Sequence, residues 1–524
     1  MSAELLLQHF ERISEAPDAI VRLRRFILDL AIRGKLVAQD ANDEPAAELL
    51  KRIYARKATT KKVAPKTERQ DLMFELPSGW CSASFGDVFS LEYGDNLPAE
   101  KRSNSGEFPV YGSNGVVGSH LQCFVRSPCI VVGRKGSAGA LNLSLAQGCC
   151  VTDVAYYCVP PKEIDLLFAF KMFHTLRLED LGKGVKPGLN RSDAYALAIA
   201  IPPIAEQRRI ATKVDELMAL CDQLEAAKGE CEQSRDQLVR ATLQRLSQPN
   251  DEESFGEHAG FALSNLARLT GRAERIKQLR QTILNLAVRG KLVTQDVRDK
   301  PAPKFDVAQK AAGRDRIKMS LPTGWSWAKV EDVADARLGK MLDKAKNSGQ
   351  PYRYLRNTNV HWFDVRFDEL KSLRLEPSEV EKYLLRDGDV LICEGGHGIG
   401  RTAVWREQEP NVVFQKALHR VRPGHLLASD FFAMCVSVYF DAGVLQNYFT
   451  GVGIPHFTGK ALSKLVFPLP PIAEQHRIVA KVAALITLCG QLEAELTSTE
   501  ADSGRLLEAV LHEALTAPAL AAVA

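Results

Sequence analysis

The sequence predicts an α+β protein with two globular α/β-mixed domains. Two long antiparallel coiled-coil helical pairs separate them, in a pseudo-twofold internal repeat. Three observations predict this fold class. A chain of 524 residues is too long for one hydrophobic core, which rarely serves more than about 250–300 residues. Several sequence blocks occur twice in the same order. These blocks have helical periodicity, whereas the stretches between them have the alternation and glycine turns of strands.

Three blocks occur in both halves of the chain. The first block is identical at eleven of fourteen positions and the third at seventeen of twenty-six. Between the second and third blocks the halves scarcely match, which favours a common frame carrying two different domains over simple drift after duplication. The blocks are ILDLAIRGKLVAQD at 27–40 and ILNLAVRGKLVTQD at 283–296, LPSGW at 76–80 and LPTGW at 321–325, and PPIAEQ with the helix after it at 201–226 and 469–494.

The third block predicts a long helix in each half. Pro203 and Pro471 suit a helix start, because their missing N–H is not needed in the first turn. The first helix is expected over about 205–246, roughly 60 Å at ~1.5 Å per residue. In the RGKLV blocks, Gly34 and Gly290 are expected to cap helices in the left-handed conformation. Apolar residues spaced as in a coiled-coil seam are Ile210, Val214, Leu217, Cys221 and Leu224, then Ile478, Val482, Leu485, Cys489, Leu492 and Leu496.

The order of the helices predicts their pairing. The helix over 205–246 is followed by a polar break and a helix ending at Arg289, which predicts an antiparallel hairpin. The last helix, 473–516, has no following partner, and the first, about 16–33, has no preceding one. The repeat therefore predicts that these two pair with each other. The predicted boundaries are 1–75 for the N-terminal helical region and basic linker, 76–203 for the first domain, 204–320 for the helical hairpin spacer, 321–470 for the second domain and 471–524 for the C-terminal helix.

Composition indicates an ordinary soluble protein, with 45% hydrophobic and 25% charged residues. The net charge of +4 permits a nucleic-acid partner without demanding one, although residues 51–70 carry eight basic side chains and one acidic one. The eleven cysteines include no C-x-x-C pair and are expected to be reduced cytosolic thiols. The N-terminus lacks a signal peptide, and the longest apolar run, 431–440, is about half a membrane helix. We expect a cytoplasmic protein with no membrane contact.

The stretch EGGHGIGRT at 394–402 resembles a phosphate-binding P-loop and raises one alternative, a nucleotide-hydrolysing protein that uses residues 395–402. Arg401 stands where a P-loop has lysine, and the following TAVW is prone to form a strand rather than the required helix. The first half has its own glycine turn, GRKGSAGA at 133–140, without a P-loop pattern. The stretch is therefore interpreted as a glycine turn between two strands.

Other catalytic patterns are also missing. The two Pro-Pro motifs follow Ile201 and Leu469, where an adenine methyltransferase needs an Asn or Asp acceptor. No H-E-x-x-H, G-x-S-x-G or Cys/His metal set is present, so we predict neither a catalytic nor a metal site. A coiled-coil interaction protein without DNA binding is a second alternative.

The ordered duplication of PPIAEQ-x-RI, LP-x-GW and RGKLV, with YGSNGVVG at 111–118 inside the first domain, resembles the specificity subunit of type I restriction-modification systems. The resemblance covers nearly the whole chain. It implies two target-recognition domains that read a bipartite, asymmetric sequence in double-stranded DNA. The helices would fix the gap between the two parts and dock two methyltransferase (modification) subunits. Restriction subunits would complete the complex.

The same resemblance implies a chain that is not an enzyme. Adenine-N6 methylation and ATP-dependent cleavage would belong to the partner subunits. S-adenosylmethionine, ATP and Mg would be cofactors of those partners, with no cofactor in this chain.

Candidate DNA contacts are the Arg, Lys, His and Asn residues of polar loops, because these side chains donate to phosphates and base edges. Trp80 and Trp325 are expected in the domain cores rather than against bases. Lys35 and Lys291 either contact phosphate or the methyltransferase, or complement helix C-termini. The candidates are Asn114, Arg134, Lys135, Lys183, Lys186, Asn190 and Arg191 in the first domain, and Lys340, Lys344, Lys346, Arg353, Arg356, Asn357, His397, Arg401 and His456 in the second.

Overall fold

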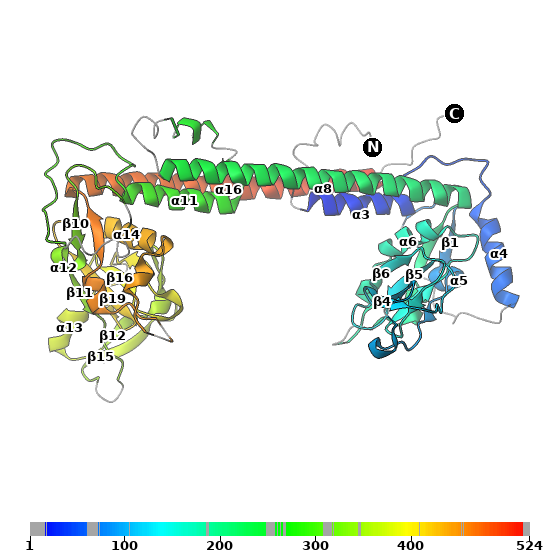
Figure 1. The fold of residues 1–524 in the computed structure, drawn as a ribbon, viewed down its shortest axis with the longest axis horizontal. Helices are drawn as coiled ribbons and strands as arrows, with labels where there is room; N and C mark the ends of the chain where they lie inside the picture. Colours follow the sequence, from blue (N-terminus) through cyan, green and yellow to red (C-terminus); the bar gives the residue numbers. More distant parts are fainter. Residues whose placement is uncertain are drawn as a thin grey trace. The chain divides into compact units, whose positions relative to one another are not determined.

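The computed structural model divides the chain into two compact units (Figure 1). Unit 1 comprises Met1–Glu232 and Thr499–Ala524, and unit 2 comprises Gln233–Ser498. Two helices, α8 (Ile204–Ser247) and α16 (Ile472–Thr516), contribute residues to both units. The structure describes residue 16 and residues 18–516, except for 60–71, 73, 104, 185–187, 248–256, 259, 263, 266–268, 308–316, 318, 344–346, 408, 452 and 454.

Unit 1 contains a mixed domain followed by the first part of α8. Its sheets have the strand orders β2-β8-β5-β6, β4-β3-β7 and β1-β9, and β3 pairs with β7 in parallel while the other pairs are antiparallel. The strands are β1 Cys81–Ser84, β2 Glu92–Tyr93, β3 Phe108–Gly112, β4 Gly115–His120, β5 Cys129–Gly133, β6 Leu141–Ser144, β7 Cys150–Val151, β8 Ala155–Cys158 and β9 Ala198–Ile201. The helices before α8 are α3 Ala19–Ile32, α4 Ala46–Thr59, α5 Phe85–Val88, α6 Leu166–Thr175 and α7 Arg191–Tyr195, with 3-10 turns at Ala99–Lys101 and Leu178–Leu181.

Unit 2 contains sheets with the orders β11-β19-β16-β17, β15-β12-β18, β10-β20 and β13-β14. Its strands are β10 Ser326–Lys329, β11 Ala334–Leu338, β12 Gln350–Leu355, β13 Val360–His361, β14 Asp364–Val365, β15 Lys371–Leu375, β16 Val390–Cys393, β17 Thr402–Val404, β18 Val413–Phe414, β19 Leu418–Pro423 and β20 Val466–Leu469. Its helices before α16 are α11 Ala273–Val288, α12 Val330–Val333, α13 Pro377–Tyr383, α14 Ser429–Asp441 and α15 Gly459–Ser463, with 3-10 turns at Asn357–Asn359, Gly396–Gly398 and Leu445–Tyr448.

Each PPIAEQ motif starts a helix directly after its second proline, as predicted, at Ile204 and at Ile472. The motif's glutamine then ties the helix to its own domain. Buried Gln207 accepts a hydrogen bond from Asp165 N at 2.8 Å and donates one to Pro202 O at 2.9 Å. Buried Gln475 accepts from Ala428 N at 2.8 Å and donates to the carbonyls of Leu426 and Pro470 at 2.9 Å each. A side chain with both donor and acceptor is needed here, so the motif has a structural role.

A buried tryptophan and an ion pair reinforce the attachment of α8. Trp80 Nε1 donates to Glu206 Oε2 at 2.9 Å, and burial raises the pKa of the Glu206 carboxyl. Arg209 forms an ion pair with Asp43 at 2.6 Å. In unit 2, Arg477 and Asp299 form an ion pair of the same length.

The RGKLV blocks end their helices in left-handed glycine caps, as predicted. Gly34 has φ 65° and Gly290 has φ 69°. A Cβ on Gly34 would lie 2.3 Å from Pro77 Cγ, so the close approach also needs glycine. The Lys35 ammonium donates to Leu515 O at 2.5 Å, in the last turn of α16. Lys35 therefore complements a helix C-terminus, but one that lies 480 residues further along the sequence.

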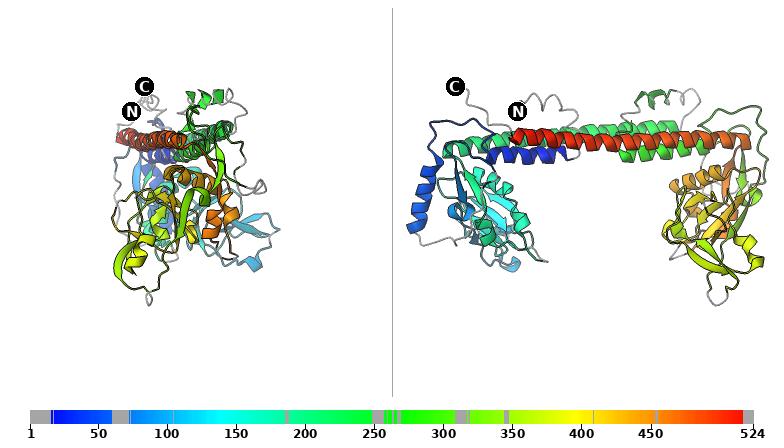
Figure 2. Two further views of the ribbon diagram at one scale, coloured as in Figure 1. Left: turned by 90° about the vertical axis from the view of Figure 1, so that its left-hand side faces the viewer. Right: turned by 180° about the vertical axis from the view of Figure 1, so that it is seen from behind.

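In unit 1, α3 lies alongside α8 and the last turns of α16 (Figure 2). Arg24 forms ion pairs with Asp222 and Glu225 of α8, at 2.6 and 2.7 Å. Arg22 donates to Gly504 O of α16 at 3.4 Å. A small apolar cluster closes the contact, formed by Ala16, Ala19, Leu507 and Val510. In unit 2, α11 is tied to α8 by Arg275 and Asp236 at 2.9 Å and to α16 by Arg280 and Glu493 at 2.7 Å.

Each domain has its own hydrophobic core. Trp80 and Trp325 are buried, as predicted, and Trp325 packs edge-on against Phe431. The apolar run 431–440 falls in α14, whose residues from Phe431 to Tyr439 are buried. The helices within the described ranges are each too short or too polar to span a lipid bilayer.

Candidate nucleic-acid interface

In unit 1, three loops meet at the end of the β5–β6 hairpin and form what we call the unit 1 platform (residues 133–140, 152–154, 183–184 and 188–190). The hairpin turn closes when Gly139 N donates to Gly133 O at 2.8 Å. Arg134 N then donates to Val154 O at 2.9 Å, and Arg134 O accepts from Leu189 N at 2.9 Å. The backbone of Arg134 therefore joins the three loops.

In unit 2, a hairpin between β16 and β17 forms the unit 2 platform (residues 393–401, 415–417, 450–451 and 455–457). Gly400 N donates to Cys393 O at 2.9 Å. Glu394 N donates to Ala417 O at 2.9 Å, and Glu394 O accepts from Phe457 N at 2.7 Å. The three backbone hydrogen bonds match those of the unit 1 platform, so Glu394 occupies the position of Arg134.

In each unit, one side chain outside the platform contacts a backbone carbonyl of the platform. Tyr156 OH donates to Leu189 O at 3.2 Å, and the buried His419 Nε2 lies 2.7 Å from Phe457 O. A carbonyl only accepts hydrogen bonds, so Nε2 of His419 carries its hydrogen. Burial lowers the pKa of His419, which keeps the ring neutral. Tyr156 and His419 are thus unlike residues that donate to corresponding backbone carbonyls in the two units.

The side chains of the unit 1 platform are cationic and aromatic. The Arg134 guanidinium lies 4.7 Å from the Tyr93 ring centroid and 5.7 Å from that of Tyr156. Arg191 lies 4.8 Å from Tyr93, on which the two arginines therefore converge. Tyr93 is 47% exposed. Cation–π contacts hold both guanidinium groups beside an open aromatic ring, together with hydrogen bonds from Arg134 Nη1 to Asp153 O at 3.0 Å and from Arg191 Nη1 to Leu91 O at 3.5 Å. This arrangement suits phosphate or base contact.

The remaining unit 1 candidates are at or near this platform. Lys135 is exposed and lies 3.7 Å from Asp153, and the exposed Lys183 donates to Asp193 at 2.8 Å. Asn190 caps α7 by accepting from Ser192 N at 3.1 Å. Asn114 is exposed in the β3–β4 turn, directly after Ser113, whose carbonyl approaches Gly133. Lys186 lies outside the described residues.

Two unit 2 candidates, Arg401 and His456, belong to the platform, and a third, Asn357, lies beside it. His456 Nδ1 lies 3.1 Å from both carboxylate oxygens of Glu394. The Arg401 side chain lies against Gly398, and the Asn357 amide lies beside Gly396. The side chain of His397 and the residues Lys344 and Lys346 lie outside what the structure describes.

The other unit 2 candidates are held by carboxylates. The Lys340 ammonium lies 2.5 Å from Glu379, whose pKa it lowers. Arg353 is ion-paired with Glu409. Arg356 lies 3.6 Å from the Glu369 carboxylate and donates to the backbone carbonyl of the same residue at 3.0 Å. Of these three, Lys340 reaches the platform through its backbone, which bridges to Gln415.

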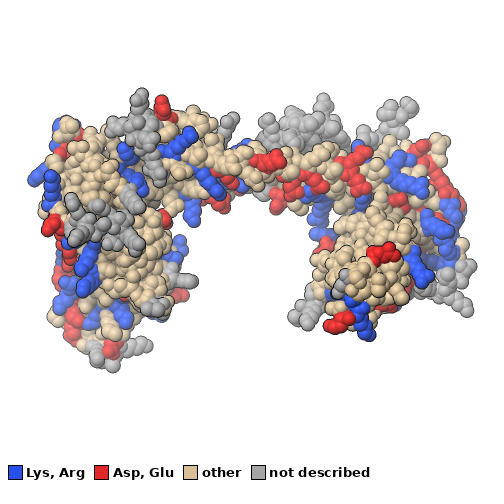
Figure 3. Space-filling view, viewed as in Figure 1, with Lys and Arg blue, Asp and Glu red and all other residues tan. Residues whose placement is uncertain are grey.

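The basic segment at 51–70 is described only as far as residue 59, in α4, where Lys and Arg side chains gather (Figure 3). Three of these cations already have carboxylate partners: Lys51 with Glu48 at 2.7 Å, Arg52 with Glu44 at 2.7 Å and Arg56 with Glu163 at 2.6 Å. Surface pairs of this kind add little to stability, but they lower the positive charge that α4 can offer to DNA.

The turn at 395–402 does not have P-loop geometry. A P-loop leads into an α-helix whose N-terminus holds the phosphates. Here a 3-10 turn at Gly396–Gly398 leads into strand β17. Among the residues that the structure describes, no group of three His, Cys, Asp or Glu side chains could hold a metal ion.

The family model described as type I restriction modification DNA specificity domain matches residues 77–230 and 322–499. The chain belongs to this family. The type I restriction enzyme EcoAI specificity subunit of Escherichia coli is 27% identical to it, over 95% of this chain and 94% of that one. The EcoEI specificity subunit of the same species is 25% identical over the same shares. The crystal structure of an HsdS subunit from Thermoanaerobacter tengcongensis covers 84% of this chain and 98% of its own, with 19% identity and a TM-score of 0.45.

Each of the two matched specificity domains contains one platform. The first includes Arg134 and the second includes Glu394, and each continues into the long helix that follows it. This chain is thus a type I restriction-modification specificity subunit, a protein that recognises DNA sequence.

Two residues at these sites, Glu394 of the unit 2 platform and Tyr93 of β2 beside the unit 1 platform, were not among the candidate DNA contacts predicted from the sequence. A signal for Glu394 is present: it follows the buried run 390–393 directly, as Arg134 follows the buried run 129–133. Tyr93 has no comparable signal, because only the fold brings it to Arg134.

Proposed function

We propose that each unit of this specificity subunit reads one part of a bipartite, asymmetric target in double-stranded DNA. Support comes mainly from the two platforms, which share their backbone hydrogen bonds but present different side chains. A shared backbone gives both units the same approach to a duplex, whereas different side chains at its surface favour different bases. An asymmetric target follows from this difference.

We propose further that α8 and α16 set the gap between the two parts of the target, because both helices contain residues of both units. An α-helix rises about 1.5 Å per residue and B-DNA rises about 3.4 Å per base pair. On this proposal, a change in length of both helices changes the number of unspecified base pairs.

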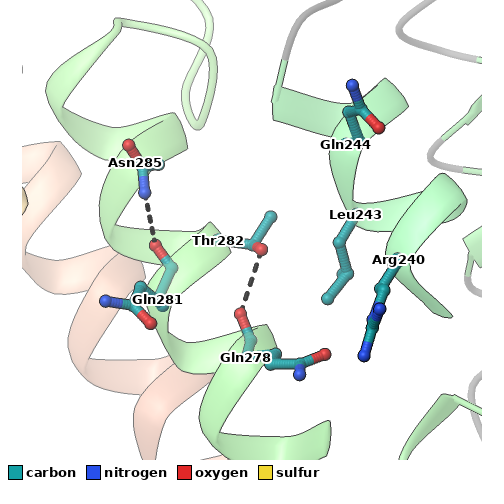
Figure 4. A pocket seen from close by; sticks show the side chains of 7 residues that line it. All are labelled: Arg240, Leu243, Gln244, Gln278, Gln281, Thr282 and Asn285. Atoms are coloured by element: carbon teal, nitrogen blue, oxygen red, sulfur yellow. Dashed lines mark hydrogen bonds between the residues drawn. The ribbon is translucent and has the colours of Figure 1, made fainter. Parts of the chain in front are cut away.

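The partner subunits in this proposal are two modification subunits and the restriction subunits. Adenine methylation with S-adenosylmethionine, and cleavage driven by ATP with Mg, belong to those partners. The support is family membership, together with surfaces on the helices that suit a protein partner. One of them is a groove of about 280 Å³ between α8 and α11 in unit 2 (Figure 4), lined by Arg240, Leu243, Gln244, Gln278, Gln281, Thr282 and Asn285. Side-chain amides can both donate and accept, so this groove suits a polar helix of a modification subunit.

The test is selection from a library of randomised duplex DNA by the full chain co-expressed with a modification subunit. The proposal predicts enrichment of one sequence with two specified parts and a fixed unspecified gap. Binding should also weaken steeply with salt, as phosphate contacts require. Enrichment of no sequence, or of a single uninterrupted one, would overturn the proposal.

A further inference from the structure

We infer that Glu394 is a specificity-determining residue that accepts a hydrogen bond from the exocyclic amino group of a cytosine, while Arg134, at the matched position of unit 1, donates to a guanine. This inference rests on the proposed function and deepens it. It names the chemistry by which the two parts of the target differ.

The match between Arg134 and Glu394 does not depend on sequence similarity. Besides the hydrogen bonds of their own backbones, the next residues form corresponding β-bridges, Lys135 with Gly188 and Gly395 with His456. Two residues after these bridge partners, Asn190 and Thr458 cap the short helices α7 and α15 with their side chains.

The two side chains leave matched backbones into different surroundings. His456 holds Glu394 through both carboxylate oxygens, and Glu394 stays 20% exposed. The residue matched to His456 is Gly188, which has no side chain to hold Arg134. Tyr93 and Tyr156 flank Arg134 instead, and Arg134 Nη1 donates to the backbone carbonyl of Asp153 at 3.0 Å. His456 is therefore a positioning residue for Glu394, rather than an independent DNA contact.

A second matched pair is also opposite in charge. Asp95 bridges in parallel to Thr152, and Lys340 bridges in parallel to Gln415. Each follows a glycine, Gly94 or Gly339, whose absent Cβ makes room for the backbone of the partner strand. The side-chain charge is thus opposite between the two units at two matched positions, Arg134 with Glu394 and Asp95 with Lys340.

A carboxylate at this place has a cost if DNA binds, because it faces phosphates of the same sign. Glu394 offsets that cost by accepting from a base that donates. In the major groove the cytosine amino group is the preferred partner of Glu, and guanine O6 and N7 are the preferred partners of Arg. Opposite charges at one position therefore favour opposite members of the G·C pair.

The experiment repeats the DNA selection with Glu394→Gln, Glu394→Asp and Arg134→Gln, each in the full chain with the modification subunit. Asp364→Asn is the control, because Asp364 is an exposed carboxylate paired with Arg366 outside the platform. Glutamine pairs with adenine. E394Q should therefore lower the preference for cytosine about tenfold at one position of one part and raise that for adenine. R134Q should remove a guanine preference in the other part only, and D364N should change neither.

The shorter Glu394→Asp variant keeps the charge but withdraws it from His456 and from the base. It should weaken the cytosine preference without replacing it by adenine. The inference is overturned if E394Q and E394D both select the wild-type sequence, or if either changes both parts. If the wild-type chain selects no sequence at all, the proposed function fails before the variants are compared.

Discussion

The glutamine of the PPIAEQ motif gives the sharpest test of how the long helices are attached to their domains. Gln475 is buried and makes three hydrogen bonds to backbone groups, whereas Gln207 makes two. Leucine has nearly the same volume, so Gln475→Leu removes the bonds without opening a large cavity. A buried polar group left without a partner costs about 1–3 kcal/mol. At the lower bound, Gln475→Leu should cost about 3 kcal/mol and Gln207→Leu about 2 kcal/mol.

The assay is urea unfolding of the full chain, with tryptophan fluorescence as the readout. Trp80 is the one tryptophan in the sequence of unit 1, and the other four lie in that of unit 2. Most of the signal therefore reports unit 2 and Gln475, while a Gln207 variant is followed through Trp80. Gln446→Leu is the matched control, because Gln446 makes one exposed bond, to Phe440 O at 3.2 Å. A shift for Gln475→Leu no larger than that for Gln446→Leu would refute the structural role of the motif.

Three further predictions concern other groups of unit 1. Burial raises the pKa of the Glu206 carboxyl in the folded chain above its value in the unfolded chain. Between these two pKa values the folded chain keeps a proton that the unfolded chain has released. The free energy of unfolding therefore falls as pH rises from the lower pKa through the higher one. Urea titrations should therefore show Glu206→Gln gaining stability relative to wild type from pH 4.5 to pH 7, and a constant difference contradicts this. Lys35→Met removes the hydrogen bond to Leu515 O and should lower the free energy of unfolding by about 1 kcal/mol. Amide hydrogen exchange in the last turns of α16 should become faster, and an unchanged exchange rate contradicts this prediction. Lys135→Ala should weaken binding to all DNA sequences alike and lower the salt slope by about one, whereas a change in base preference would assign Lys135 to a base.

The helical frame could be predicted from sequence because its signals are local and occur twice. Pro203 and Pro471 mark the helix starts, and Gly34 and Gly290 mark caps at which φ must be positive. These features depend on backbone geometry that neighbouring residues determine. The role of Gln207 could not be predicted, because its partner Asp165 is 42 residues away.

The candidate interface was harder to predict. Their positions in polar loops predicted Arg134 and Arg401 as candidates. The burial and the ion pairs of such side chains, however, depend on residues that are distant in the sequence. His456 shows this, since its partner Glu394 precedes it by 62 residues. The match of Arg134 with Glu394 lies in backbone hydrogen bonds, and the side chains give no sign of it. A sequence comparison aligns residues by similarity and therefore overlooks a position whose charge has changed sign.

Mapping N6-methyladenine in cells that express this chain with a modification subunit shows whether each unit reads its own part of one DNA target. The map should be compared with that from a chain in which residues 81–200 come from another specificity subunit. We expect one bipartite methylated motif for the wild-type chain. For the exchanged chain we expect a motif that keeps one part and the gap but changes the other part. Methylation that is unchanged by the exchange, or altered in both parts, would contradict this expectation.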